Sequence, residues 1–169
     1  MSDVLPWLEY RWDFDFPVGM FRAIAERLRG TPTRLEVGVL DESDHRLTRR
    51  PSGKWSAQEH AGHLLSVEKL WERRLGEFVR GEPALTAADM ENRATEGSHY
   101  NGRSLAEVLG GFRVARAATV ATLDGFDLAM AARVAHHPRL DRPMRLVDLC
   151  FFAAEHDDHH LAAIHELLR

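Results

Sequence analysis

Histidine is concentrated in one short segment near the end of the chain, where residues 155–160 read Glu-His-Asp-Asp-His-His. The segment lies within a helical hydrophobic pattern, so positions can be counted at about 100° per residue from the centre of the apolar stripe. On this count His156 falls at about −20° and His160 at about +20°, whereas Asp158 falls near 180°. Two imidazoles one turn apart are therefore predicted on the face that enters the core.

Buried imidazole rings need polar partners, because an unpaired polar group is costly away from water. Either each ring hydrogen-bonds a buried side chain, or the two rings share one metal ion. Histidines at i and i+4 point the same way and can ligate one ion together. Neighbouring acidic residues such as Asp157 are suited to orient imidazoles, so we favour the metal interpretation. His159 lies nearer the edge of the stripe, at about −80°.

A third ligand has to come from another helix, and the predicted helix at about 57–80 offers two histidines. His60 lies about 20° from the apolar stripe centred on Trp71, and His63 lies about 80° from it. Helical geometry by itself therefore favours His60 over His63.

Two other metal-site patterns occur in incomplete form. The Glu-x-x-His pattern of di-iron bundles runs from Glu96 to His99, in an irregular stretch. The zincin pattern His-Glu-x-x-His is approached between His156 and His160, but Asp157 is shorter than the glutamate base of that mechanism. Neither pattern displaces the three-histidine interpretation.

Amphipathic helices are predicted to position these residues. Pro17 can begin the first helix, because its missing N–H would be unpaired there in any case. Gly30 is a predicted stop, with a second segment from Thr31 to about residue 41. One kinked helix over the same residues is the alternative.

The remaining long helices have clearer boundaries. Ser56 and Glu59 form a capping box before the helix at about 57–80, and Gly81 is its predicted stop. A third helix follows Ser104 and ends at residues 124–125, and the last runs from about 145 to the end. We expect residues 42–55 to form a loop, residues 82–103 to contain only a short helix, and residues 126–144 to be a connector without strands.

The pattern predicts an all-α protein, a four-helix bundle with short extra helical segments. At 169 residues the chain suits one domain, 1–169, in which residues 1–16 form an N-terminal arm. The net charge of −4 gives no basic footprint for nucleic acid. Cys150 is the single cysteine, so an internal disulfide is excluded. With no signal-like start and no apolar run of about 18 residues, we expect a cytoplasmic protein without membrane partners.

The order of these residues resembles the DinB-like superfamily of helical-bundle metalloproteins. Trp55-Ser56 precedes Glu59, His63 and Leu64, and the distant Glu155-His156-x-x-His159-His160-Leu161-x-x-Ile164 follows. The resemblance runs from about residue 17 to the end. It implies that one divalent metal ion is bound by His63, His156 and His160. The candidates for side chains around these ligands are then His60, Glu59, His159 and Asp157.

Three imidazoles leave the ion at least one open position, which is the ligand count of a catalytic site. Imidazole does not select one metal, so we expect zinc or nickel, with iron or manganese as alternatives. The resemblance implies hydrolysis of a small molecule or S-transfer with a low-molecular-weight thiol, in a homodimer. A non-catalytic, stress-related metal-binding protein and an interaction module without metal are the other interpretations.

Several side chains are candidates for a substrate pocket beside the ion: Trp55, Trp71, Asn92 and Arg93. Aromatic residues at helical spacing also suit a core position. Arg73 and Arg74 are predicted as solvated charge, and Cys150 as a packing residue.

Overall fold

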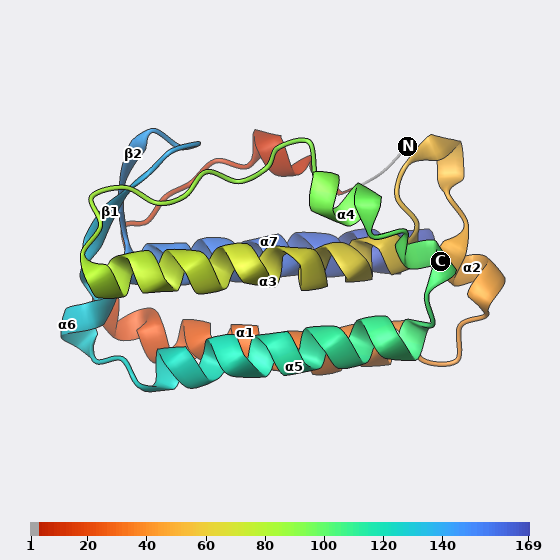
Figure 1. The fold of residues 1–169 in the computed structure, drawn as a ribbon, viewed down its shortest axis with the longest axis horizontal. Coiled ribbons are helices and arrows are strands. Elements are labelled where there is room, and N and C mark those ends of the chain that lie inside the picture. The colour runs from red at the N-terminus through yellow and green to blue at the C-terminus, as the bar shows by residue number, and fades with distance from the viewer. Residues whose placement is uncertain (1–3) are drawn as a thin grey trace.

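The computed structural model describes residues 4–169 and contains four long helices packed side by side (Figure 1). These are α1 (Phe21–Val39), α3 (Ala57–Arg80), α5 (Leu105–Asp124) and α7 (Leu146–Leu167). Each packs against two others, in the order α1–α7–α3–α5 around the bundle. The expected all-α bundle is confirmed, and the two helices that carry the histidine motifs, α3 and α7, are neighbours. Within residues 4–169 no helix is both long enough and apolar enough to span a membrane.

Short elements occupy the connections between the long helices. They are η1 (Trp7–Glu9), η2 (Val18–Met20), α2 (Asp44–Thr48), η3 (Pro51–Gly53), α4 (Arg93–Gly97), η4 (Tyr100–Gly102) and α6 (Leu128–Ala131). The strands β1 (Val134–His137) and β2 (Arg142–Arg145) form an antiparallel hairpin, with Val134 opposite Arg145. The prediction of a connector without strands was wrong here. Strands of four residues are too short for their alternation to be recognised.

Helix α3 begins and ends as its sequence predicts. The Ser56 side chain accepts a hydrogen bond from the Glu59 backbone N–H, and the Glu59 carboxylate accepts one from the Ser56 N–H. Gly81 ends the helix with φ of 70°, a left-handed conformation that glycine adopts without steric cost.

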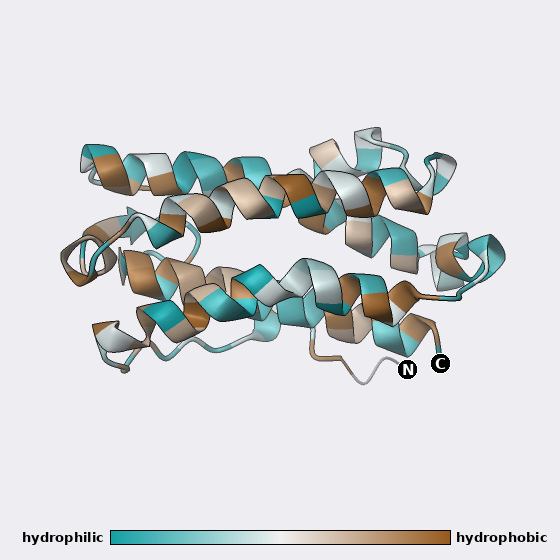
Figure 2. Cartoon of the chain, turned by 90° about the horizontal axis from the view of Figure 1, so that it is seen from below, coloured by the Kyte–Doolittle hydropathy of each residue, from teal (hydrophilic) through white to brown (hydrophobic). Residues whose placement is uncertain are grey.

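The buried apolar side chains form two clusters, one at each end of the bundle. Hydrophobic and hydrophilic residues are interspersed along the long helices, as expected when each helix has one face in the core (Figure 2). One cluster, nearer the hairpin, contains Phe21, Leu28, Trp71 and Phe152. The other contains Leu35, Leu64, Phe112 and Ile164. Between them along each long helix lies a layer of buried polar side chains, Thr31, Glu68, Arg116, Thr119 and Asp157.

Arg116 of α5 holds this polar layer together. Its Nε and Nη2 donate to Glu68 Oε1 of α3 at 2.9 and 2.6 Å. Its Nη1 and Nη2 donate to the two carboxylate oxygens of Asp157 of α7 at 2.5 and 3.1 Å. The hydroxyls of Thr119 and Thr31 donate to the same carboxylates, at 2.7 and 2.8 Å. Burial lowers the pKa of Arg116, but the combined attraction of the two carboxylates is the larger effect, so the pKa of Arg116 is raised.

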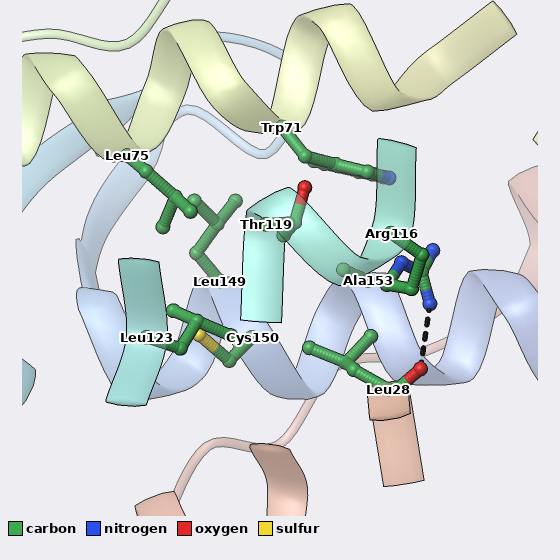
Figure 3. A pocket seen from close by; sticks show the side chains of 9 residues that line it. All are labelled: Leu28, Trp71, Leu75, Arg116, Thr119, Leu123, Leu149, Cys150 and Ala153. Carbon is green, nitrogen blue, oxygen red and sulfur yellow. Dashed lines mark hydrogen bonds between the residues drawn. The ribbon is translucent and has the colours of Figure 1, made fainter. Parts of the chain in front are cut away.

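The same guanidinium also compensates for a proline in α1. The structure shows α1 unbroken through Gly30 and Pro32, so the stop predicted at Gly30 was wrong. Pro32 has no N–H to donate to the Leu28 carbonyl four residues earlier. Arg116 Nη1 donates to that carbonyl instead, at 3.1 Å (Figure 3). One side chain therefore contacts α1, α3 and α7 from α5.

Replacing Arg116 should be strongly destabilising. Arg116→Ala leaves two buried carboxylates without a cation, and we expect a loss of about 3–5 kcal/mol in the free energy of unfolding. Arg113→Ala, one turn earlier on α5, removes an exposed ion pair with Glu36 and should cost less than about 1 kcal/mol. Urea unfolding of both variants measures the difference. Equal losses would contradict the role assigned to Arg116.

Candidate metal centre

Three buried imidazoles converge between α3 and α7. His63 Nε2 lies 3.2 Å from His156 Nε2, and His160 Nε2 lies 3.2 Å from the same atom. One ligand atom of each ring lies within 4.8 Å of those of the other two. The structure thus brings together the three residues that the sequence resemblance assigns to the metal.

The spacing of these nitrogens fits a single ion. A zinc–nitrogen bond of about 2.0–2.1 Å and tetrahedral angles place two ligand nitrogens about 3.3 Å apart. Two of the three Nε2 pairs are already at that separation. The donor set of three imidazoles is also one that zinc, nickel, iron and copper accept. Side chains therefore need little rearrangement to bind one ion.

The other nitrogen of two rings has a partner that fixes its orientation. His63 Nδ1 lies 2.9 Å from the Thr95 hydroxyl of α4, and His160 Nδ1 lies 2.8 Å from His60 Nδ1. With the Nδ1 proton of His63 donated to Thr95, the Nε2 lone pair faces the centre of the cluster. His156 Nδ1 is buried and has no hydrogen-bond partner among residues 4–169.

Burial keeps the imidazoles neutral. It lowers the pKa of His63 to about 3 and that of His60 to about 4, and repulsion from neighbouring histidines adds to the effect. Burial likewise lowers the pKa of His156 and of His160 well below the usual value. The unprotonated form is the one that ligates a metal, so protons do not compete with an ion near neutral pH.

Indole rings enclose the histidines. The Trp55 ring lies 4.9 Å from the His63 ring and 6.2 Å from the His160 ring. The ring centre of Trp7, on the N-terminal arm, lies 5.1 Å from the ring centre of His156, and that of Trp71 lies 5.9 Å from the same ring. The arm is therefore packed on α7, where it covers the site.

A pocket of about 480 Å³ opens beside the three histidines. This volume is in the range that holds one drug-sized ligand. Trp7, Trp55, Trp71 and Phe152 supply much of its apolar wall, and Asn92 and His159 also line it. The site therefore combines a cluster of ligand atoms with space for a small molecule.

The remaining candidate residues take different positions relative to the three-histidine cluster. Helical geometry favours His60 as third ligand, but His63 joins the cluster and His60 lies behind His160. Helix α3 packs against both α5 and α7, so one stripe centre does not describe its buried face. The pocket candidates Trp55, Trp71 and Asn92 line the pocket, and so does His159, which was expected beside the metal ligands.

Two predicted neighbours of the ligands face elsewhere. Glu59 caps α3 and pairs with Arg50, so it does not orient an imidazole. Asp157 belongs to the layer of buried polar side chains and accepts hydrogen bonds there from Arg116 and Thr31. The predicted pocket residue Arg93 has a side chain 73% exposed and pairs with Glu91.

Some site residues were not recognised from the sequence. Arg74, predicted as solvated charge, is buried, because the chain after α3 folds back and the Thr86 carbonyl accepts from its guanidinium. Thr95 and Arg139 carry no motif and reach the pocket through tertiary structure.

The lone cysteine is remote from this chemistry. Cys150 lies in a small apolar cavity of about 20 Å³, beside Leu123 and Leu149 (Figure 3). Burial raises the pKa of its thiol to about 12. It is a packing residue, as predicted.

Comparison with known proteins bears on this arrangement. A family model described as the DinB superfamily matches residues 22–164. The chain belongs to the DinB superfamily. The DinB match begins after the N-terminal arm, so the contact of Trp7 with His156 lies outside the matched region. Comparison with curated proteins finds no match.

One solved structure is similar over nearly the whole length of both chains. YfiT from Bacillus subtilis is 19% identical, with a TM-score of 0.78 over 94% of this chain and 91% of that one. Its structure is described as that of a probable metal-dependent hydrolase with an unusual four-helix bundle topology. At this identity the similarity establishes a shared fold.

The histidine cluster predicts a defined metal stoichiometry. We expect the purified protein to bind about one zinc or nickel ion per chain, and a His156→Ala/His160→Ala double variant to lose it, because one imidazole cannot hold the ion. Elemental analysis after dialysis measures this. His165→Ala, an exposed histidine on the same helix, is the matched control. Retention of the ion by the double variant would exclude this site.

Proposed function

We propose that His63, His156 and His160 bind one divalent ion and that the protein is a metal-dependent hydrolase of a small molecule. The observation that carries the proposal is the convergence of three Nε2 atoms at the wall of a pocket of about 480 Å³. When bound there, zinc or nickel would supply Lewis acidity and a site for an activated nucleophile. Iron and manganese are the alternatives.

His159 is suited to accept a proton in this pocket. It lines the same pocket as the three proposed ligands, and its ring centre is 5.1 Å from that of His160. Its Nδ1 is buried and has no hydrogen-bond partner among the described residues. The rings of Trp7 and Tyr10 each lie 5.7 Å from it and hold it in place. We assign it the role of general base.

Hydrolysis makes the smaller demand on the space in this pocket, and we favour it over S-transfer. A thiol and an acceptor have to occupy the site together, whereas hydrolysis needs one organic substrate and water. A pocket of about 480 Å³ suits one such substrate. The description of YfiT as a probable metal-dependent hydrolase supports the same choice. S-transfer with a low-molecular-weight thiol is the competing reaction in the assay below.

We further propose that residues 1–169 form one domain, that two copies form a homodimer, and that the protein is cytoplasmic. The mass in solution tests the dimer.

The zinc- or nickel-loaded protein should hydrolyse members of a panel of simple esters and amides without added thiol. His159→Gln should reduce kcat/KM by about 10²-fold or more, the usual contribution of a general base, while metal content stays unchanged. His165→Gln is the control and should retain full activity. Electrophiles with a panel of low-molecular-weight thiols form the second arm. Turnover only with thiol would replace hydrolysis by S-transfer, and no metal-dependent turnover would contradict catalysis.

A further inference from the structure

Basic side chains gather at the end of the pocket that is away from the proposed metal ligands. Arg74 of α3, His137 of β1 and Arg139 of the hairpin turn all line the pocket there. Arg74 Nη1 lies 3.3 Å from His137 Nε2. The hairpin lies beside the start of α7 (Figure 1), and in this way it brings residues distant in sequence to one end of the pocket.

Arg139 has an unused hydrogen-bond donor. Its Nη2 is buried and has no hydrogen-bond partner among the described residues. Its guanidinium carbon lies 5.3 Å from the Phe152 ring centre and 5.7 Å from that of Trp7. Burial lowers the pKa of Arg139, the direction expected for a guanidinium with no carboxylate beside it. A buried guanidinium donor without an acceptor is costly unless a ligand supplies one.

The two carboxylates near this end, Glu77 and Asp89, accept hydrogen bonds from other groups, and no bond from either to Arg74 or Arg139 is found among the described residues. Both carboxylate oxygens of Glu77 accept from Thr86, one from its N–H and one from its hydroxyl. The Thr86 carbonyl accepts from Nε and Nη2 of Arg74. Asp89, an exposed acidic residue lining the pocket, accepts from the backbone N–H groups of Glu91 and Arg93.

His137 does not remove the excess of donors. The Leu140 N–H donates to His137 Nδ1, and Arg74 Nη1 faces the other ring nitrogen. A neutral imidazole has only one acceptor nitrogen. Burial, with Arg74 and Arg139 nearby, lowers the pKa of His137 to about 4 and keeps it neutral. One of the two donors is therefore unsatisfied.

Aromatic rings connect this basic end to the histidine cluster. The ring centre of Phe152 lies 5.2 Å from that of His137 and 6.3 Å from that of Trp71. The ring centre of Trp71 lies in turn 5.9 Å from that of His156. Arg74 follows His63 by eleven residues, which is about 16 Å along the helix axis. The Arg74 side chain extends back over part of that length, because its guanidinium carbon lies 5.6 Å from the centre of the Trp71 ring.

We propose that this end of the pocket binds a carboxylate of the substrate, through the guanidinium of Arg139 with Arg74 beside it. The apolar middle of the substrate packs against the pocket wall formed by Trp7, Trp71 and Phe152, and its other end reaches the three imidazoles. The substrate class is thus an elongated small molecule with an apolar body and a terminal carboxylate. This assignment of substrate rests on the proposed function, whereas the carboxylate site itself does not require an ion.

A matched pair of ligands tests the site. The probes are 6-phenylhexanoate and its neutral amide, titrated by calorimetry into the full chain, both after chelator treatment and after zinc loading. We expect the carboxylate to bind at least about tenfold more tightly than the amide in both forms, as for a hydrogen bond to a charged group. Arg139→Gln should reduce this preference to less than about threefold.

Two further variants make the result specific. Arg142→Gln removes an equal charge from an exposed position on β2 that does not line this pocket, and should retain the full preference. Arg139→Lys keeps the charge, so it should retain part of the preference even if the glutamine variant is poorly folded. Thermal melts of all variants report folding.

The outcomes separate the two proposals. Equal binding of the two probes to the wild type, or a preference unchanged by Arg139→Gln, would overturn the carboxylate site. A preference seen only in the zinc-loaded protein would also overturn it, because the carboxylate would then be binding the ion. An Arg139-dependent preference in a protein that binds none of zinc, nickel, iron and manganese would support the carboxylate site and contradict the proposed function alone.

Discussion

The guanidinium of Arg116 is the contact on which the relative positions of the four long helices depend. Its five N–H groups reach Glu68 of α3, Asp157 of α7 and a carbonyl of α1. Asp157 follows directly after a proposed metal ligand, and Glu68 lies five residues after another. A charged layer between two apolar clusters is tolerated because every donor is paired, and it disfavours any sliding of α3 against α7 that would unpair them.

The bundle supplies ligand positions, and the connections between helices supply the rest of the site. Helices α3 and α7 hold the three histidines at fixed separations. The N-terminal arm covers His156 with Trp7, α4 supplies Thr95 to His63, and the hairpin brings Arg139 to the pocket. Rigid helices thus fix the ligand geometry, while less regular segments determine what can reach it.

Sequence reasoning recovered what local periodicity encodes. Helices α3, α5 and α7, the Ser56 cap and the inward placement of His156 and His160 all follow from spacing along single helices. Choosing His63 over His60 required the resemblance, because helical angles do not tell which neighbour a wide buried face meets. Spacing left open whether the first helix is broken at Gly30 or continuous, since the donor that replaces the N–H missing at Pro32 comes from Arg116. Arg74 and Arg139 were missed for the same reason: their burial depends on chain segments that fold back over them.

The central claim is that one ion binds between α3 and α7. Anomalous diffraction from crystals grown with zinc tests it most directly, because the zinc edge locates the ion without assumptions about the protein. We predict one strong peak per chain about 2.0–2.1 Å from Nε2 of each of His63, His156 and His160. A strong peak at other residues, with the three imidazoles bonded only to protein or water, would contradict it.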